Sequence, residues 1–282
     1  PEDHPGTSRI ISRLVKSDES AKIYVGCANW NRQHLRHFYP RGIKNELEYY
    51  AKQFNCIEFN ATFYRNFPVS QFEKWYHTVP EYFKFFPKIH QNISHVKRLA
   101  HVENDLNEFL DGIVHLKEKL GTVFLQLHNN FAPKDFGRLA HFISLWPKEI
   151  ALAIELRHTQ WFNDAKVADE LYHLFEENRI ANIIVDTAGR RDLLHMRLTN
   201  NEAFVRFVAT GHESDHKRMN DWIMRLKLWM DQGLQNIHFF LHQNLDKDSP
   251  LLPAHFIKNM NPVLGTHLKI PATLNSGMET LF

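Results

Sequence analysis

Eight short runs of β-branched and aromatic residues recur along the 282-residue chain, and they constrain its fold more than any other feature. Most of the gaps between them carry a helical pattern, as in Leu106, Phe109, Leu110 and Ile113. Strands that alternate with helices predict an α/β fold with a parallel sheet. The eight runs are Ile23–Ala28, Cys56–Asn60, Phe83–Ile89, Thr122–Leu127, Leu152–Leu156, Asn182–Asp186, Phe204–Val208 and Ile237–His242.

This count of strands predicts a single (β/α)8 barrel of the TIM type, because one such barrel accounts for a chain of this length. The pattern after the sixth strand is the weakest, so a helix is expected to be weak or missing between the sixth and seventh strands. The expected organisation is a polar N-terminal arm over residues 1–20, a barrel domain over 21–260 and a C-terminal tail over 261–282. A doubly wound open sheet is the alternative fold.

Side-chain alternation along the strands predicts which residues point into the barrel. Helices cover the outside of a barrel, so the more apolar face of each strand is expected to point outward. Polar side chains then point inward near the carboxyl ends of the strands, at the end of a barrel where active sites lie. The inward set is Glu58, Asn60, Lys88, Gln126, His128, Glu155, Arg157, Asp186, Arg206 and His242.

The inward residue types suggest acid–base chemistry on an anion. Lys88, Arg157 and Arg206 are expected to bind the anion, because arginine offers a planar fork to carboxylate or phosphate. The expected catalytic residues are Glu58, Glu155 and Asp186, with Glu58 or Glu155 as the general base. The remaining expected substrate contacts are Asn60, Gln126, Tyr64, Trp161 and His242. The alternative is a structural network, in which the buried charges only neutralise one another.

A divalent metal is a further hypothesis for this site. Carboxylate and imidazole groups bind such ions in other barrels. No motif of fixed spacing links them here. The candidate ligands are His128, Glu155, Asp186 and His242.

Several strand ends also resemble motifs of a known family. Ile57-Glu-Phe-Asn-Ala-Thr-Phe-Tyr64 resembles the Glu-x-Asn-x-Thr-Phe-Tyr pattern of the YecE-like family, domain of unknown function 72. Ile93-Ser-His95 and Glu155-Leu-Arg-His158 resemble two further motifs of that family. The first strand departs from the family pattern at Gly26-Cys-Ala-Asn-Trp30, which suggests a divergent branch. The resemblance implies a TIM-type barrel and does not imply an activity.

Composition excludes several classes of protein. Two cysteines cannot build a disulfide scaffold, and 34 basic against 32 acidic residues argue against a strongly basic nucleic-acid coat. No apolar run approaches the length of a membrane span, so no membrane partner is expected. No signal peptide is visible at the first residue, so Cys27 and Cys56 are expected to be buried, reduced thiols of a cytoplasmic protein.

Together these features predict an enzyme whose substrate is a small anion, such as a phosphorylated sugar or a nucleotide. Hydrolysis and isomerisation both fit the residue types. The alternative from a different class is a non-catalytic nucleic-acid-binding module that uses Lys97, Arg98, Arg190 and Arg191.

Overall fold

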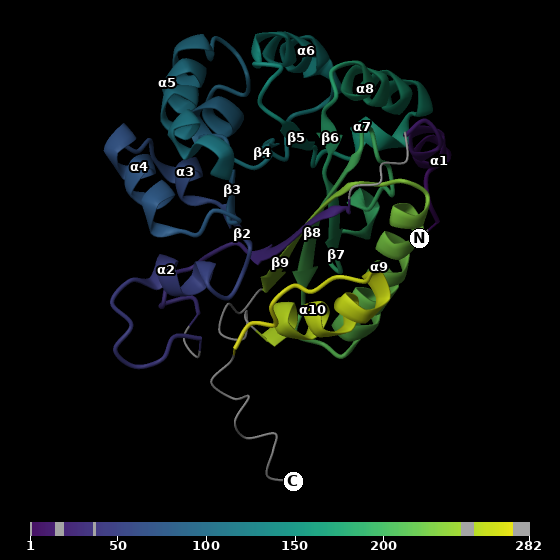
Figure 1. Cartoon of the computed structure of the whole chain (residues 1–282). Coiled ribbons are helices and arrows are strands. Elements are labelled where there is room, and N and C mark those ends of the chain that lie inside the picture. Colours follow the sequence, from purple (N-terminus) through teal and green to yellow (C-terminus); the bar gives the residue numbers. More distant parts are fainter. Residues whose placement is uncertain (1, 15–19, 36–37, 244–250, 273–282) are drawn as a thin grey trace.

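The computed structural model describes residues 2–14, 20–35, 38–243 and 251–272. Figure 1 shows the strands in the middle of the molecule with the longer helices around them. The strands are β1 (Lys22–Cys27), β2 (Cys56–Phe59), β3 (Lys84–Pro87), β4 (Val123–Gln126), β5 (Leu152–Glu155), β6 (Ala181–Asn182), β7 (Ile184–Thr187), β8 (Glu202–Ala209) and β9 (Asn236–Gln243). The α-helices are α1 (Pro5–Ser12), α2 (Glu46–Ala51), α3 (Ala61–Tyr64), α4 (Val69–Thr78), α5 (Glu103–Ile113), α6 (Phe136–Leu145), α7 (Gln160–Asn163), α8 (Ala165–Glu177), α9 (Ser214–Asp231) and α10 (Leu251–Leu264).

Each of the eight predicted runs overlaps a strand, and every ladder between strands in the described residues is parallel. The sixth run is divided at Ile183 into β6 and β7. The ladders form three sheets, with the orders β1-β9-β8-β7, β2-β3 and β4-β5-β6. The α/β class is thus confirmed, whereas a closed eight-stranded barrel stays a prediction.

Contacts other than ladders join the separate sheets. The Asn55 side chain accepts a hydrogen bond from Val25 N at 3.1 Å and donates one to Ile23 O at 2.8 Å, which links β1 to the start of β2. Isolated parallel bridges, one of which pairs Lys88 with Phe124, link β3 to β4. At Ile183, the backbone N–H donates to Ile154 O of β5 at 3.0 Å.

One apolar cluster receives a side chain from every strand. Its members are Tyr24, Cys56, Phe86, Phe124, Ala153, Ala181, Ile183, Val185, Phe204 and Phe240. A second, larger cluster joins the opposite faces of the strands to the helices. The side chains of Ile57, Leu125 and Val205 belong to this outer cluster, as the alternation predicts. Cys27 and Cys56 are both buried, and neither forms a disulfide.

Capping side chains and the spacing of apolar residues explain where the helices form, as α8 illustrates. The Asp164 carboxylate caps α8 by accepting hydrogen bonds from Lys166 N at 2.9 Å and Val167 N at 3.2 Å. Helix α8 then buries Ala168, Leu171, Tyr172 and Phe175, which lie on one face at helical spacing. Within the described part of the chain, no helix is long and apolar enough to cross a membrane.

The segment between β7 and β8 carries no α-helix within residues 188–201, all of which the structure describes. Only a short 3-10 helix, η4 (Arg191–Leu193), lies there. Helix α1 from the N-terminus packs against this segment instead: His4 N donates to Met196 O at 3.0 Å, and Thr7 bonds to the same carbonyl. Of the predicted arm, residues 1 and 15–19 lie outside the described residues, as do residues 273–282 of the predicted tail. Helix α10 extends to Leu264, inside the region predicted as tail.

Thr7 provides a test of how firmly α1 is held. Its hydroxyl is buried, donates to Met196 O at 2.8 Å and accepts from Leu198 N at 2.9 Å. We expect Thr7→Val to lower the free energy of unfolding by about 1–3 kcal/mol in urea denaturation, because valine leaves Leu198 N unpaired and leaves Met196 O with only its bond from His4 N. The control Ser12→Ala removes an exposed hydroxyl bond from the same helix and should change stability by less than about 0.5 kcal/mol. Equal losses in both variants would contradict the docking described.

Candidate active site

A single arginine lies at the centre of the candidate site. Arg206 extends from β8, and its Nε and Nη2 donate to the two carboxylate oxygens of Glu58 at 3.1 and 3.0 Å. Its Nη1 donates to Glu155 Oε2 at 2.5 Å. Since all three side chains are buried, one guanidinium neutralises two carboxylates that lie away from water.

These contacts set the protonation of both carboxylates. Burial would raise the pKa of Glu58, but the charges of Arg206 and His242 outweigh it and hold that pKa well below its usual range. Burial likewise opposes ionisation of Glu155, and the charges of Arg206 and Arg157 lower its pKa. For Arg206, burial opposes the charge, but the two glutamates raise its pKa. Both carboxylates are therefore ionised near neutral pH.

Further polar side chains complete the network around this arginine. Gln126 Nε2 donates to Glu155 Oε1 at 2.8 Å, and Lys88 Nζ donates to Gln126 Oε1 at 2.8 Å. These partners fix the orientation of the Gln126 amide. We call the whole set the Arg206 cluster: Glu58, Asn60, Lys88, Gln126, Glu155, Arg157, Arg206 and His242.

The outer members of the cluster contact its two carboxylates. His242 Nε2 lies 2.7 Å from Glu58 Oε2, and Asn60 Nδ2 donates to Glu58 Oε1 at 3.0 Å. Arg157 Nε lies 3.6 Å from Glu155 Oε1, and the Arg157 side chain is 35% exposed. Arg157 is therefore the ionisable side chain of this set most open to a ligand from solvent.

Strand geometry explains why these residues meet. Each of six members follows an inner apolar residue by two positions on its strand, so both side chains point the same way. The pairs are Cys56 and Glu58, Phe86 and Lys88, Phe124 and Gln126, Ala153 and Glu155, Phe204 and Arg206, and Phe240 and His242. The polar layer thus lies on the apolar layer, at the carboxyl ends of the strands.

Lys88 is held in an unusual environment. Its Nζ lies 4.2 Å from the centre of the Phe63 ring, and its hydrogen-bond partner in the cluster is a neutral amide. Burial, followed by the nearby charge of Arg206, lowers the pKa of Lys88 to about 8. A substantial fraction of this amine is therefore neutral near physiological pH.

Phe63 and His95 are site residues that the sequence argument missed. The His95 ring lies 5.0 Å from Phe63 and 5.4 Å from His128, and its Nδ1 is 2.8 Å from Ser94 Oγ. Burial, followed by the charge of Lys88, lowers the pKa of His95 to about 4, so its imidazole is neutral. Both residues lie within the motifs that resemble the family, and this resemblance was the sequence feature that could have identified them.

The backbone around His95 is unusual as well. Ser94 and His95 lie in a π-helical turn, η1 (Asn92–Val96), of a kind often found at functional sites. Three non-glycine residues with positive φ follow it, namely Arg98, Leu99 and His101. Such strained residues persist only where the surrounding structure holds them, and here Leu99 is fully packed in the core.

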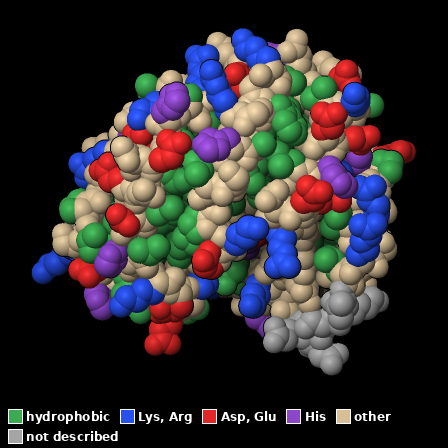
Figure 2. Space-filling model, turned by 90° about the horizontal axis from the view of Figure 1, so that it is seen from above, with side chains coloured by type: hydrophobic (Ala, Val, Ile, Leu, Met, Phe, Trp, Pro, Cys, Tyr) green, Lys and Arg blue, Asp and Glu red, His purple; other side chains and the backbone are tan. Residues whose placement is uncertain are grey.

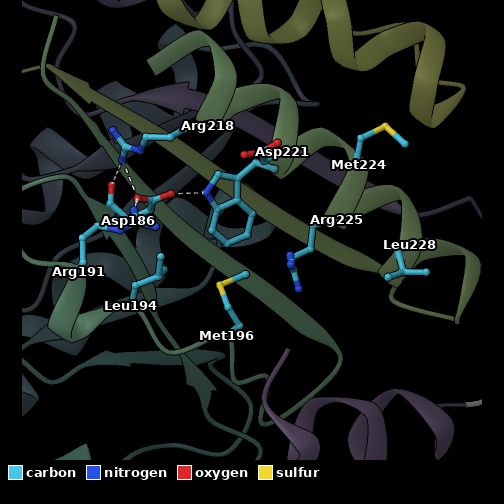
Figure 3. A pocket seen from close by; sticks show the side chains of 10 residues that line it. Asp186, Arg191, Leu194, Met196, Arg218, Asp221, Met224, Arg225 and Leu228 are labelled. Carbon is cyan, nitrogen blue, oxygen red and sulfur yellow. Dashed lines mark hydrogen bonds and ion pairs between the residues drawn. The ribbon is translucent and has the colours of Figure 1, made fainter. Parts of the chain in front are cut away.

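Asp186 does not join the Arg206 cluster, and its predicted inward direction is wrong. Its carboxylate accepts hydrogen bonds from Arg191, from Arg218 Nη2 at 2.6 Å and from Trp222 Nε1 at 2.7 Å. Figure 3 shows it beside a separate cavity of about 410 Å³. Val185 takes the inward direction in β7. The rule that the polar face points inward fails because polar donors of α9, rather than an apolar helix face, cover this strand.

Trp161 is also wrong as a predicted substrate contact, whereas that role for Tyr64 stays a prediction. The Trp161 ring is fully buried, stacks on Phe131 and donates from Nε1 to Phe131 O at 2.7 Å. Its role in the structure is therefore packing. Tyr64 is 68% exposed, and Phe63, its neighbour in α3, is the residue that faces Lys88.

The metal hypothesis gains no support from the arrangement of its candidate ligands. In residues 2–14, 20–35, 38–243 and 251–272, no group of three or more His, Cys, Asp or Glu side chains could hold an ion. Asp186 points away, and the guanidinium of Arg206 occupies the space between Glu58 and Glu155. His128 accepts a hydrogen bond from Asn130 N through Nδ1 at 3.1 Å.

Comparison with known proteins places this chain in a family. A sequence profile described as "Protein of unknown function DUF72" matches residues 24–273. The chain belongs to the DUF72 family. It is 26% identical over 242 residues to the UPF0759 protein YecE of Escherichia coli (strain K12), which covers 78% of this chain and 86% of that protein. The UPF0759 protein YunF of Bacillus subtilis (strain 168) is 26% identical over 150 residues, covering 50% of this chain and 52% of YunF.

Solved structures of DUF72 family proteins share the fold. One from Enterococcus faecalis V583 matches with a TM-score of 0.69 and 20% identity, covering 88% of this chain and 99% of that one. One from Thermotoga maritima MSB8 matches with the same TM-score and identity, covering 85% of this chain and 99% of that one. At this level of identity the likeness concerns the DUF72 fold alone.

Proposed function

We propose that this DUF72 protein is an enzyme that binds a small anionic substrate at the Arg206 cluster and acts on it by acid–base chemistry. In this proposal the three sheets are arcs of one distorted (β/α)8 barrel, since every strand contributes to the inner apolar cluster. The Arg206 cluster then lies at the carboxyl-terminal mouth, where barrel enzymes place their catalytic residues. The reaction is a hydrolysis or an isomerisation of a phosphorylated or carboxylated compound.

The observation that carries the proposal is the surplus of positive charge in the cluster. Three cations, Lys88, Arg157 and Arg206, face two carboxylates. Arg206 pairs closely with both carboxylates, whereas Lys88 bonds to a neutral amide and Arg157 stands 3.6 Å from its partner. An anionic group that reached Lys88 and Arg157 would balance this charge and accept hydrogen bonds from both.

The pKa shifts assign the roles within this proposal. A carboxylate whose pKa is strongly lowered is a weak base, so Glu58 and Glu155 act mainly by orienting Arg206, Gln126 and His242. Lys88, with a pKa of about 8, is the group suited to accept or donate a proton near neutral pH.

The nucleic-acid alternative has weaker support. Arg190, Arg191 and Lys97 each pair with an aspartate, so three of its four basic residues are already neutralised. On the face seen in Figure 2, basic side chains are interspersed with acidic ones and do not form one continuous patch. Binding of a polyanion depends on such a patch.

Arg157→Ala tests the anion site directly. In a thermal-shift screen of sugar phosphates and carboxylates, a ligand at 100 times its Kd should stabilise the unaltered protein by about 2.7 kcal/mol. We expect Arg157→Ala to weaken that binding by about ten- to a hundredfold, the effect of losing a charge-assisted hydrogen bond. Its free energy of unfolding should change by less than about 1 kcal/mol, since the side chain is partly exposed.

Arg32→Ala is the matched control. Arg32 is 43% exposed and contacts Glu46 through Nε at 3.2 Å, and its hydrogen-bond partners Glu46 and Ile43 are not members of the cluster. Anion binding should be unchanged in this variant. Equal binding by the unaltered protein and Arg157→Ala would overturn the proposed site, and a salt-sensitive shift with oligonucleotides alone would favour the nucleic-acid alternative.

A further inference from the structure

Two buried lysines of this chain differ in what their amines contact. Lys119 Nζ donates to the carbonyls of Tyr76 and Val79, both at 2.7 Å, and lies 4.4 Å from the Tyr76 ring. Lys88 Nζ lies similarly close to an aromatic ring but donates to one amide oxygen, Gln126 Oε1. In the described residues no carboxylate forms an ion pair with Lys88. Its amine therefore keeps capacity for another partner, whereas two carbonyls hold the amine of Lys119.

The neighbours of Lys88 favour the neutral, nucleophilic form of its amine. Burial of the side chain and the proximity of Arg206 both disfavour the ammonium ion, and together they outweigh the opposing charges of Glu58 and Glu155. With a pKa of about 8, roughly one Lys88 in ten is neutral at pH 7, against fewer than about one in a thousand for an ordinary lysine. Burial and a neighbouring cation are the two devices that activate imine-forming lysines in enzymes.

From this geometry we infer that Lys88 forms an imine with the carbonyl carbon of a small anionic aldehyde or ketone. This inference rests on the proposed function, and it narrows the substrate class to carbonyl compounds that carry a carboxylate or phosphate. The anionic group binds Arg157, and the carbonyl carbon lies at Lys88 Nζ.

The covalent step needs no further reactant. The neutral Lys88 amine donates its lone pair to the carbonyl carbon, and the carbonyl π electrons move to oxygen, which takes a proton. The resulting carbinolamine loses its hydroxyl as water while a carbon–nitrogen double bond forms. In sum, one ammonium and one carbonyl give one iminium and one water. The neutral imidazole of His95, which also contacts Phe63, is the nearby group able to relay a proton in the dehydration.

Reductive trapping of the whole chain tests the inference. The protein is incubated with glyoxylate, a small anionic aldehyde, and then reduced with sodium borohydride, which converts an iminium into a stable secondary amine. Peptide mass spectrometry then locates the modified lysines. We expect Lys88 to be modified at least about tenfold faster than Lys119, with a rate that rises as pH passes through about 8. Lys88→Arg keeps the positive charge and should lose this adduct while its circular dichroism spectrum stays unchanged.

Two further reagents distinguish this inference from the proposed function. Acetaldehyde is an aldehyde without a charge, and inorganic phosphate competes for the anion site. Faster trapping of glyoxylate than of acetaldehyde at Lys88, slowed by phosphate, would support both. Equal trapping of the two aldehydes at Lys88, unaffected by phosphate, would support the imine and overturn the anion site. Anion binding by calorimetry without an adduct at Lys88, or with Lys88 and Lys119 equally modified, would overturn the imine and leave the proposed function standing.

Discussion

Arg206→Met is expected to lower the free energy of unfolding at pH 7 by about 3–5 kcal/mol, the cost of breaking a buried ion pair by removing one partner. The variant leaves Glu58 and Glu155 ionised and buried with their main counter-charge gone. Methionine fills much of the arginine volume, so little of the loss should come from a cavity. Urea denaturation monitored by tryptophan fluorescence measures it. This is a large share of the total stability of about 5–15 kcal/mol that is typical of a domain.

The loss should become smaller as the pH falls. In the unaltered protein the pKa values of Glu58 and Glu155 are lowered, so their contribution is present above the ordinary glutamate pKa and is lost as the pH falls through the folded-state pKa. In the variant, burial without Arg206 raises both pKa values. The destabilisation of the variant by its buried, unpaired carboxylates is complete above their raised folded-state pKa values. It disappears below the unfolded-state pKa of glutamate. The raised pKa values of the variant narrow the difference in stability between the two proteins from pH 7 toward about pH 4, and the lost contribution of the unaltered protein narrows it further below about pH 4.

Two further variants test whether the loss of stability comes from breaking the buried ion pairs or from removing any arginine. Arg138→Ala removes a side chain that is 49% exposed in an ion pair with Asp135, and it should cost less than about 1 kcal/mol. Adding Glu58→Gln and Glu155→Gln to Arg206→Met should recover part of the lost stability, because the buried charges then disappear together. A loss in Arg206→Met no larger than in Arg138→Ala, or one that does not vary with pH, would contradict a desolvated network.

Strand alternation was sufficient to predict how most of the Arg206 cluster converges. Glu58, Gln126 and Arg206 each lie opposite outward-facing apolar neighbours, and the periodicity of two residues is local to a strand. Parallel strands then bring their carboxyl ends together. The roles of these residues in binding and catalysis stay predictions, as does closure of the sheets into one barrel.

The errors came from partners that are distant in sequence. Whether the Trp161 ring is exposed to solvent or buried depends on Phe131, 30 residues away, whose carbonyl accepts a hydrogen bond from the indole N–H. Tyr64 and Phe63 are adjacent in a single helical turn, and only the placement of that turn on β3 decides which ring meets Lys88. Helix α1 meets the β7–β8 segment across a large separation in sequence, because Thr7 bonds to Met196 and Leu198, which lie 189 and 191 residues further along the chain. No periodicity in the sequence encodes such contacts.

Asp186 is the candidate site residue for which such distant contacts matter most, and the second large prediction concerns its substitution. We expect Asp186→Ala to lower the free energy of unfolding by about 3 kcal/mol, because the buried carboxylate is the hydrogen-bond partner of Arg191, Arg218 and the Trp222 indole. Arg218 keeps its ion pair with Asp215, which limits the loss. Anion binding at the Arg206 cluster should be unchanged within about twofold, since Asp186 faces α9 and the cavity beside it.

Asp192→Ala is the matched control for this prediction, because it removes a nearby aspartate that is 47% exposed and paired with Arg190. It should cost less than about 1 kcal/mol. Calorimetric titration of the anion, together with urea denaturation, distinguishes the two roles of Asp186. A structural aspartate lowers stability and spares binding, whereas a catalytic one at the mouth would spare stability and lower binding or turnover. If Asp186→Ala weakened anion binding as much as Arg157→Ala does, the direction of β7 described here would have to be reconsidered, and with it the separation of this cavity from the active site.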